Sequence, residues 1–299
     1  YLERQRNAAT QDVAQAGSTF KVFTLAAALE SGISLNSTFN GNSPLRVQGG
    51  QIRNFANASY GYVTVTKATQ SSINTAYVAM NARIGPEKTV DAAVRAGLPA
   101  DTPGLDDYPG NTLGSASPHA IDMANAFATF ASRGERHEAH IVRTATRPDG
   151  TAAYTGNTQG ERVFAEDVMD DTNWALQQVV TSGTGRAASI GRPVAGKTGT
   201  SSDNMSAWFV GYTPQLSTAV VLFNTDDEGN PISIGSFGGR GEITGGGFPA
   251  RMWSNYMRQA MQGESVRVGA EWSDPAAVQQ QLVHGGSIAD RASHIWRLP

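Results

Sequence analysis

The chain has 299 residues, a formal net charge of −3 and no cysteine, and 39% of its residues are hydrophobic. This length accommodates one large domain or two smaller ones. The slightly acidic balance argues against a general nucleic-acid binder. The absence of cysteine excludes disulfides, thiolate metal sites and a cysteine nucleophile.

The basic residues are divided unevenly between arginine and lysine. Of 23 basic residues, four are lysines: Lys21, Lys67, Lys88 and Lys197. A lysine ammonium can lose its proton in a protein, whereas an arginine guanidinium cannot. The bias therefore hints that some of these lysines occupy sites of proton transfer, with codon bias as the alternative explanation.

The sequence contains no segment typical of membrane insertion or export. No apolar run approaches the roughly 18–20 residues that a membrane-spanning helix needs, and no signal peptide opens the chain. The first residue is Tyr1 rather than Met. We therefore expect a processed product or a fragment of a longer protein.

The first two thirds of the chain alternate helical patterns with polar segments. Apolar spacing typical of helices occurs over residues 17–32, 66–85, 86–98, 117–134 and 165–183. Residues 33–65 are rich in Gly, Asn and Ser and contain short strand-like pieces such as "PLRVQGGQIRNF". Residues 141–154 resemble a hairpin.

The last third is rich in β-strand patterns. "PVAGKTGTS", "SAWFVGYTP" and "STAVVLFNT" are short runs separated by turn residues, which predicts an antiparallel meander. A glycine-rich loop over 235–247 precedes a final amphipathic helix over 248–263, and residues 264–299 form a tail without a clear pattern. Helices first and a sheet later predict an α+β fold.

Two short motifs place serine beside candidate proton carriers. Ser18 and Lys21 form S-x-x-K at the start of an apolar helix, where residues three apart share a face. Ser72 and Asn74 form S-x-N and can serve one site only from a turn just before the following helix. Each motif alone is better explained by helix capping.

The segment "GRPVAGKTGTSS" allows two readings. Gly191 to Thr198 match the phosphate-binding pattern G-x-x-x-x-G-K-[ST], but a strand pattern follows where that motif needs a helix. Alternatively, Lys197 to Thr200 form an edge strand. There Gly199 lets a substrate backbone lie close, and Lys197 with two threonine hydroxyls faces a carboxylate.

Other chemistry finds little support in the sequence. "HEAH" at residues 137–140 has the wrong spacing for the zinc motif H-E-x-x-H. No G-x-S-x-G elbow supports a Ser-His-Asp triad. We expect no metal and no cofactor.

The order S-x-x-K, S-x-N, K-T-G is the signature of the penicillin-binding protein and serine β-lactamase superfamily. The flanking segments "GSTFKVFTLAAALE", "QSSINTAYVAM", "TSGTGRAA", "AGKTGTSSDNMSAWFVGYTP" and "GGGFPARMWSNYM" closely resemble the transpeptidase domain of class A, bifunctional penicillin-binding proteins. The likeness runs from about residue 12 to about residue 261. It implies a central antiparallel sheet flanked by helices, with an all-helical lobe.

The resemblance implies roles for the first two motifs. Ser18 would attack the D-Ala-D-Ala carbonyl of a peptidoglycan stem peptide, with Lys21 as general base of lowered pKa. Ser72 would relay a proton to the leaving D-alanine. Asn74 would hold Lys21 and the substrate amide.

The K-T-G segment has implied roles as well. Lys197 would tune Ser72, while Thr198 and Thr200 would bind the terminal carboxylate beside Gly199. The backbone N–H groups of Ser18 and Thr200 would form the oxyanion hole. An amine from a second stem peptide would complete the cross-link, and β-lactams would acylate Ser18.

The sequence also departs from the family pattern. Family members have one or two sheet strands ahead of the serine motif, but 17 residues precede Ser18, so we expect an N-terminally truncated transpeptidase domain over residues 1–263. The resemblance further implies a longer parent protein with a glycosyltransferase domain and a membrane anchor, located on the extracytoplasmic face of the bacterial plasma membrane.

Several alternatives stay open within the superfamily. A D,D-carboxypeptidase differs only in the acceptor, and a penicillin sensor would be acylated without cross-linking. A class A β-lactamase needs a Glu-x-x-Leu-Asn loop, whereas "AEDVMD" from Ala165 to Asp170 lacks Leu and Asn and is typical of the acidic first turn of a helix. A nucleotide-binding protein is the alternative outside the superfamily.

Overall fold

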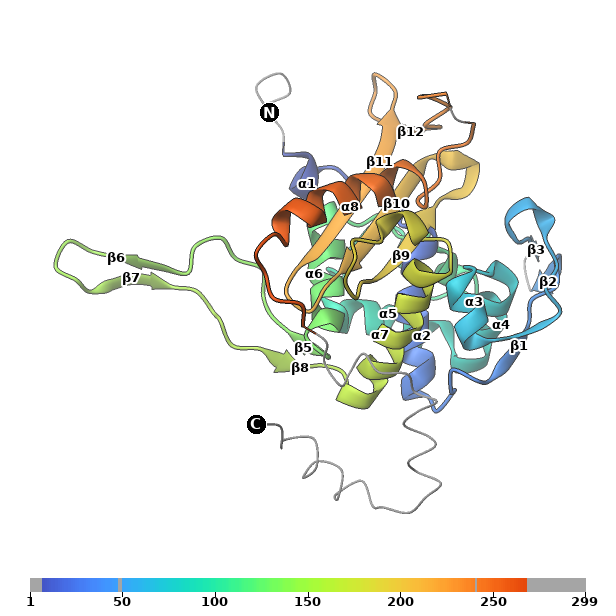
Figure 1. Ribbon diagram of the computed structural model, residues 1–299, viewed down its shortest axis with the longest axis horizontal. Helices are drawn as coiled ribbons and strands as arrows, with labels where there is room; N and C mark the ends of the chain where they lie inside the picture. Colours follow the sequence, from blue (N-terminus) through green and yellow to red (C-terminus); the bar gives the residue numbers. More distant parts are fainter. Residues whose placement is uncertain (1–6, 48–49, 240, 268–299) are drawn as a thin grey trace, which may run out of the picture.

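The computed structural model describes residues 7–47, 50–239 and 241–267. Its core combines a group of helices with an antiparallel sheet, as the α+β expectation requires (Figure 1). The helices are α1 (Ala8–Gln11), α2 (Lys21–Glu30), α3 (Val65–Gln70), α4 (Asn74–Ile84), α5 (Pro86–Ala96), α6 (Ala120–Ala131), α7 (Glu166–Thr181) and α8 (Phe248–Ala260).

Helix α2 runs through the middle of the molecule. Its residues from Lys21 to Ala28 are all buried, as expected for a helix that is apolar all round. Phe23 contacts the rings of Phe127 and Phe130 on α6, with centroid separations of 6.5 and 5.9 Å. The expected helix over 17–32 therefore forms, and its first turn is a 3₁₀ turn, Gly17–Phe20.

The predicted meander forms the main sheet. Strands β9 (Ala195–Thr200), β10 (Ser206–Tyr212), β11 (Ser217–Thr225) and β12 (Pro231–Ile232) pair in the order β12-β11-β10-β9, and every pair is antiparallel. Lys197 on β9 lies opposite Val210 on β10. Strand β9 has a strand partner on one side alone among the described residues.

Helices cover both faces of the sheet (Figure 1). Strand β10 is buried along its whole length, and successive side chains of a strand point to opposite faces. Trp208 and Val210 join the core that contains α2 and α6. Phe209, between them, packs on Trp253 of α8 with ring centroids 5.3 Å apart.

Four two-stranded ribbons lie outside the main sheet in the described residues. Each has two antiparallel strands: β1 (Thr38–Asn40) with β4 (Tyr62–Thr64), β2 (Leu45–Val47) with β3 (Gly50–Ile52), β5 (Glu135–Arg136) with β8 (Glu161–Arg162), and β6 (Thr144–Thr146) with β7 (Ala152–Thr155). The β6–β7 ribbon projects far from the body (Figure 1) and confirms the hairpin expected over 141–154.

The main sheet is built from residues downstream of the S-x-x-K motif. On the edge of β11 away from β10, the described pairing is limited to Asn224 and Thr225 with β12. No strand that precedes Ser18 joins this sheet within the described residues. Within the described residues, the sheet thus consists of strands that follow the serine motif.

The end of the chain adds no further element to the described structure. Residues 264–267 follow α8 without forming a helix or strand, and the remainder of the expected tail, 268–299, lies outside the described residues. Across the described ranges, none of the helices combines the length and the apolar character needed to cross a membrane.

Candidate active site

Ser18 lies at the N-terminal end of the central helix. It is the second residue of the 3₁₀ turn Gly17–Phe20, which continues directly into α2. Ser18 is partly exposed while Gly17 and Thr19 on either side are buried. Within the described residues no hydrogen bond is made to its Oγ, so the hydroxyl is available to a ligand.

The turn that carries Ser18 packs tightly against β9. Gly17 has a φ of +54°, and a Cβ there would lie 2.8 Å from the carbonyl carbon of Thr200. A Cβ on Gly199 would lie 2.6 Å from the carbonyl oxygen of Ala16. Real Cβ atoms do not approach that closely, so both glycines are needed for backbone-to-backbone contact. We expected Gly199 to make room for a substrate, but it makes room for the serine turn.

Lys21 is completely buried among neutral acceptors. Its Nζ donates to Ser72 O at 2.7 Å, to Ser72 Oγ at 3.1 Å and to Asn74 Oδ1 at 2.7 Å. Burial is the main cause that lowers the pKa of Lys21 well below its usual 10.5, and the charge of Lys197 adds to it. Among the described residues, Lys21 forms no ion pair with a carboxylate.

Ser72 and Asn74 lie at the junction of α3 and α4, as the sequence predicted. Ser72 has a φ of +55°, a strained conformation for a residue other than glycine, and such strain is concentrated at functional sites. Asn74 is the first residue of α4. Its Oδ1 accepts from Lys21, and its Nδ2 donates to the backbone oxygen of Arg53 at 2.8 Å.

Lys197 is the second lysine that bonds Ser72. It belongs to β9, is completely buried, and donates to Ser72 Oγ at 2.8 Å and to Thr198 O at 3.0 Å. Burial lowers the pKa of Lys197 to about 7. Ser72 Oγ therefore lies between two buried amines, and together they occupy both of its acceptor sites.

The two threonines of β9 lie beside further polar groups. Thr198 Oγ1 shares a 2.7 Å hydrogen bond with Thr184 Oγ1, and Thr200 Oγ1 accepts from Gly245 N at 3.2 Å. Thr184 was not among the site residues predicted from the sequence. Thr184 lies in "TSGTGRAA", one of the segments that resemble the family. The proximity of its hydroxyl to Thr198 could not be predicted, because it depends on how α7 packs on β9.

The fold excludes the nucleotide-binding alternative for Gly191–Thr198. Ala195 to Thr200 form a strand, and β10 follows after a short turn, whereas a phosphate-binding loop must lead into a helix. The ammonium of Lys197 is directed at Ser72 and is not at a helix terminus. That alternative is wrong.

The acidic segment Ala165–Asp170 is engaged in ion pairs. It forms the first turn of α7, as predicted. Glu166 pairs with Arg133 at 2.8 Å and with Arg162 at 3.2 Å, and Asp170 pairs with Arg133 at 2.7 Å. These carboxylates hold α7 to the neighbouring loop.

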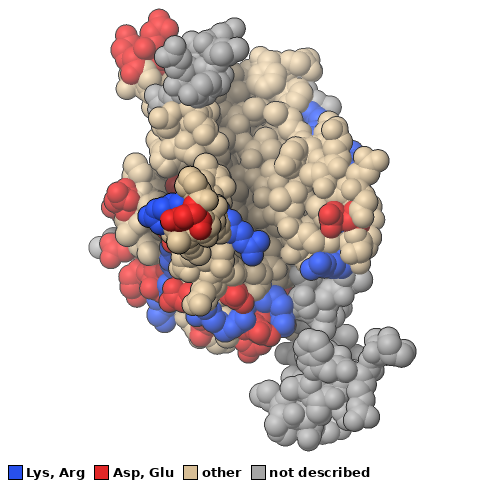
Figure 2. Space-filling model, turned by 90° about the vertical axis from the view of Figure 1, so that its left-hand side faces the viewer, with Lys and Arg blue, Asp and Glu red and all other residues tan. Residues whose placement is uncertain are grey.

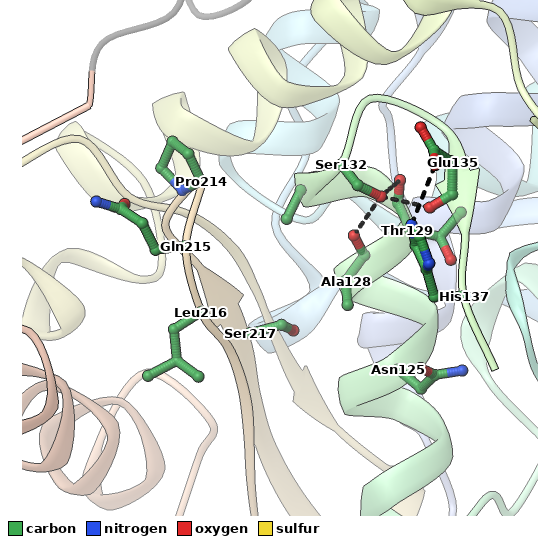
Figure 3. A pocket seen from close by; sticks show the side chains of 11 residues that line it. Asn125, Ala128, Thr129, Ser132, Glu135, His137, Pro214, Gln215, Leu216 and Ser217 are labelled. Carbon is green, nitrogen blue, oxygen red and sulfur yellow. Dashed lines mark hydrogen bonds and ion pairs between the residues drawn. The ribbon is translucent and has the colours of Figure 1, made fainter. Parts of the chain in front are cut away.

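A separate hollow lies between the end of α6 and the β10–β11 turn (Figure 3). Its volume is about 210 Å³, and it is lined on one side by Ser132, Glu135 and His137 and on the other by Pro214 and Leu216. His137 Nε2 lies 3.2 Å from Glu135 Oε1. None of the residues of the three motifs lines this hollow.

Comparison with known proteins gives the same assignment as the motifs. Residues 2–238 match the family model of the penicillin binding protein transpeptidase domain. Penicillin-binding protein 1A of Mycolicibacterium smegmatis is 34% identical over 85% of this chain and 35% of its own length, and that of Mycobacterium tuberculosis is 34% identical over 84% and 33%. The chain thus spans about a third of these curated relatives.

A solved structure supports the same conclusion. PonA1 of M. tuberculosis in complex with penicillin V superposes with a TM-score of 0.79 and 32% identity, covering 89% of this chain and 73% of that one. This chain belongs to the penicillin-binding protein transpeptidase domain family.

Proposed function

We propose that this chain is a D,D-transpeptidase that cross-links peptidoglycan stem peptides through an acyl-enzyme on Ser18 and that β-lactams inhibit it covalently. The observation that carries the proposal is the convergence of two buried lysines on Ser72 Oγ, one of which, Lys21, follows the accessible Ser18 by one helical turn. Buried amines of lowered pKa are suited to act as bases near neutral pH.

In the first step, Ser18 Oγ attacks the carbonyl carbon between the two D-alanines. The new C–O bond forms as the hydroxyl proton passes to Lys21 Nζ in its neutral form, which burial favours. The neutral amine keeps two of the three hydrogen bonds that the ammonium donates, and its lone pair accepts the proton. Lys21 does not bond Ser18 in the free protein, and such contacts commonly tighten when substrate binds. The backbone N–H groups of Ser18 and Thr200 hold the oxyanion in this proposal.

In the second step, the peptide C–N bond breaks and D-alanine leaves. Ser72 gives its hydroxyl proton to the leaving nitrogen and regains one from Lys21, 3.1 Å away. Because both lysines donate to Ser72 Oγ, its own proton is free to point at the substrate. This arrangement supports the relay role of Ser72.

Carboxylate recognition falls to β9 in the proposal. Thr198 and Thr200 offer hydroxyls, and the ammonium form of Lys197 offers charge at the same strand. The amine of a second stem peptide then attacks the acyl-enzyme carbonyl. The cross-linking C–N bond forms, the ester C–O bond breaks, and the surplus proton of the amine passes through Lys21 to Ser18 Oγ. Neither a cofactor nor a metal takes part.

The wider setting is also part of the proposal. The chain spans about a third of its curated relatives, and the whole protein would carry a glycosyltransferase domain and a membrane anchor. The transpeptidase domain, residues 1–263, would act on the extracytoplasmic face of the bacterial plasma membrane. The tail beyond it has no proposed role.

The test is a reaction with a peptide that ends in D-Ala-D-Ala and an added amine acceptor. We expect release of D-alanine together with a peptide–acceptor product, both lost in Ser18→Ala. D-alanine release without the acceptor product would favour a D,D-carboxypeptidase. Rapid, repeated hydrolysis of penicillin would favour a β-lactamase.

A further inference from the structure

Asn54 is a buried amide whose hydrogen-bonding capacity is fully used. It lies in the segment between β3 and β4 and is 5% exposed. Its Nδ2 donates to Gly41 O at 2.9 Å and to Ala58 O at 2.8 Å. Its Oδ1 accepts from Thr75 N at 3.1 Å and from Thr75 Oγ1 at 3.3 Å. An asparagine amide offers two donors and two acceptor sites.

These bonds join the loop over residues 41–61 to the start of α4. Thr75 is the second residue of that helix, and the residue before the helix, Ile73, provides no side-chain cap. The first N–H groups of a helix need acceptors from outside it. Asn54, 21 positions upstream, supplies such an acceptor to Thr75 N. It therefore attaches the loop to the residue that follows the S-x-N motif.

Arg53, the residue before Asn54, determines the orientation of the Asn74 side-chain amide. The backbone oxygen of Arg53 accepts from Asn74 Nδ2 at 2.8 Å, while Asn74 Oδ1 accepts from Lys21 Nζ at 2.7 Å. If the Asn74 amide turned over, its oxygen would face the Arg53 oxygen and its NH₂ would face the lysine amine. The position of Arg53 therefore selects the orientation that holds Lys21.

We propose that Asn54 is a positioning residue for Lys21, acting through the Arg53 carbonyl and the Asn74 amide. Without Asn54 the loop loses its bonds to Thr75 of α4, the Arg53 oxygen is no longer held opposite Asn74 Nδ2, and Lys21 loses an ordered acceptor. This inference rests on the proposed function, because it assigns Lys21 as the base that activates Ser18.

The test compares Asn54→Ala with Asn42→Ala. Asn42 lies in the same loop and its Oδ1 accepts from Gly61 N at 2.8 Å, but neither of these residues touches α4 in the hydrogen bonds of the structure. The measurement is acylation by a fluorescent penicillin, giving the rate constant at saturation and the final label per chain. We expect Asn54→Ala to lower that rate constant about 10-fold, less than the roughly 100-fold that a 1 Å misplacement can cost, with complete final labelling.

A purely structural role gives a different result. In that case Asn54→Ala would lower the final labelled fraction and leave the saturating rate constant unchanged, which would overturn the proposal. A rate loss of equal size in Asn42→Ala would also overturn it, because any loosening of the loop would then slow acylation without a specific role for Asn54.

A double-mutant cycle adds a readout that is specific to the route through Asn74. Because Asn54 acts through Asn74, adding Asn54→Ala to Asn74→Ala should change the rate less than about twofold. Two independent, additive losses would contradict the proposed route.

A milder variant keeps the test decisive if Asn54→Ala is insoluble. Asn54→Asp retains the acceptor for Thr75 and loses both donors to the loop, and we expect a slower acylation rate constant with full labelling. Insolubility of both variants would show that Asn54 serves stability, against the proposal. Absence of labelling in the unaltered protein would instead refute the proposed function itself.

Discussion

Two clusters of cations in this molecule are built in opposite ways. The two lysines of the active site are completely buried, and their hydrogen-bond partners are the neutral oxygens of Ser72, Asn74 and Thr198. Arg133, at the end of α6, is about one third exposed and pairs with Glu166 and Asp170.

The arginine cluster continues over the surface beside α7. Arg162 pairs with Glu166 at 3.2 Å and lies 3.9 Å from Glu135. Arg95 bonds Glu30 at 2.6 Å and Asp91 at 2.7 Å. On the face shown in Figure 2, basic and acidic side chains lie side by side in the same way. These arginines face carboxylates and stay in contact with water, with side chains 31–45% exposed.

The difference between the clusters shows what each cation is for. A carboxylate beside an amine stabilises the ammonium and would raise its pKa, whereas burial without a carboxylate lowers it. Lys21 and Lys197 are buried without a carboxylate partner among the described residues, and their pKa values are lowered. The scarcity of lysine in the sequence is consistent with this division, because arginine cannot lose its proton.

The largest expected effect comes from exchanging the two kinds of cation at Lys21. Lys21→Arg replaces an amine that can be neutral with a permanently charged guanidinium, so it removes the group that can accept a proton from Ser18. We expect acylation by penicillin to slow by about 1,000-fold, within the range for loss of a general base. Lys88→Arg is the matched control, because Lys88 is a surface lysine that bonds Ser31 Oγ. A Lys21→Arg acylation rate within tenfold of the original would contradict the role of Lys21 as a proton acceptor.

A smaller effect is expected in the pH dependence of stability. The pKa of Lys197 is about 7 in the folded protein and near 10.5 when unfolded, so the unfolded chain binds more protons between these values. The free energy of unfolding should therefore rise with pH from about 7 towards 10, by at most about 1.4 kcal/mol per pH unit for each such group. Urea unfolding at several pH values measures this.

The corresponding control removes the titrating group. In Lys197→Met the rise in unfolding free energy between pH 7 and 9 should be smaller, and Lys21 accounts for what is left. Above pH 10 the sign reverses, because burial raises the pKa of Tyr77 and of Tyr212 above 10. An identical rise in Lys197→Met and the unaltered protein would contradict a lowered pKa at Lys197.

The smallest effect is expected in the arginine cluster. Arg133→Ala removes ion pairs to Glu166 and Asp170 that are partly exposed and screened by solvent. We expect the free energy of unfolding to fall by about 1 kcal/mol, less at high salt, while the acylation rate stays unchanged. Parallel urea unfolding and penicillin labelling check both parts. A slowed acylation would mean that the two clusters are coupled.

The sequence predicted the parts of this molecule that depend on local patterns. The helix after Ser18, the turn at Ser72 and the meander that carries Lys197 each follow from residue spacing and turn residues, and all three are present. The convergence of both lysines on one hydroxyl could be expected from the family resemblance alone, because it joins residues 51 and 125 positions apart.

Other features could not be predicted because they arise from packing between distant segments. Thr184 reaches Thr198 through the contact of α7 with β9, and Asn54 caps a helix in which it does not lie. The β1–β4 and β5–β8 ribbons have strands of two or three residues, too short to show alternation. Gly199 was correctly marked as a site of close approach, but the partner is the backbone of Ala16.

The most direct test of the account is to locate the atom that penicillin acylates. Intact-mass spectrometry after mixing with penicillin, followed by peptide mapping, should show one long-lived adduct per chain on the peptide that contains Ser18. The adduct should be absent from Ser18→Ala. An adduct on another residue, or one that persists in Ser18→Ala, would contradict Ser18 as the nucleophile served by the two buried lysines.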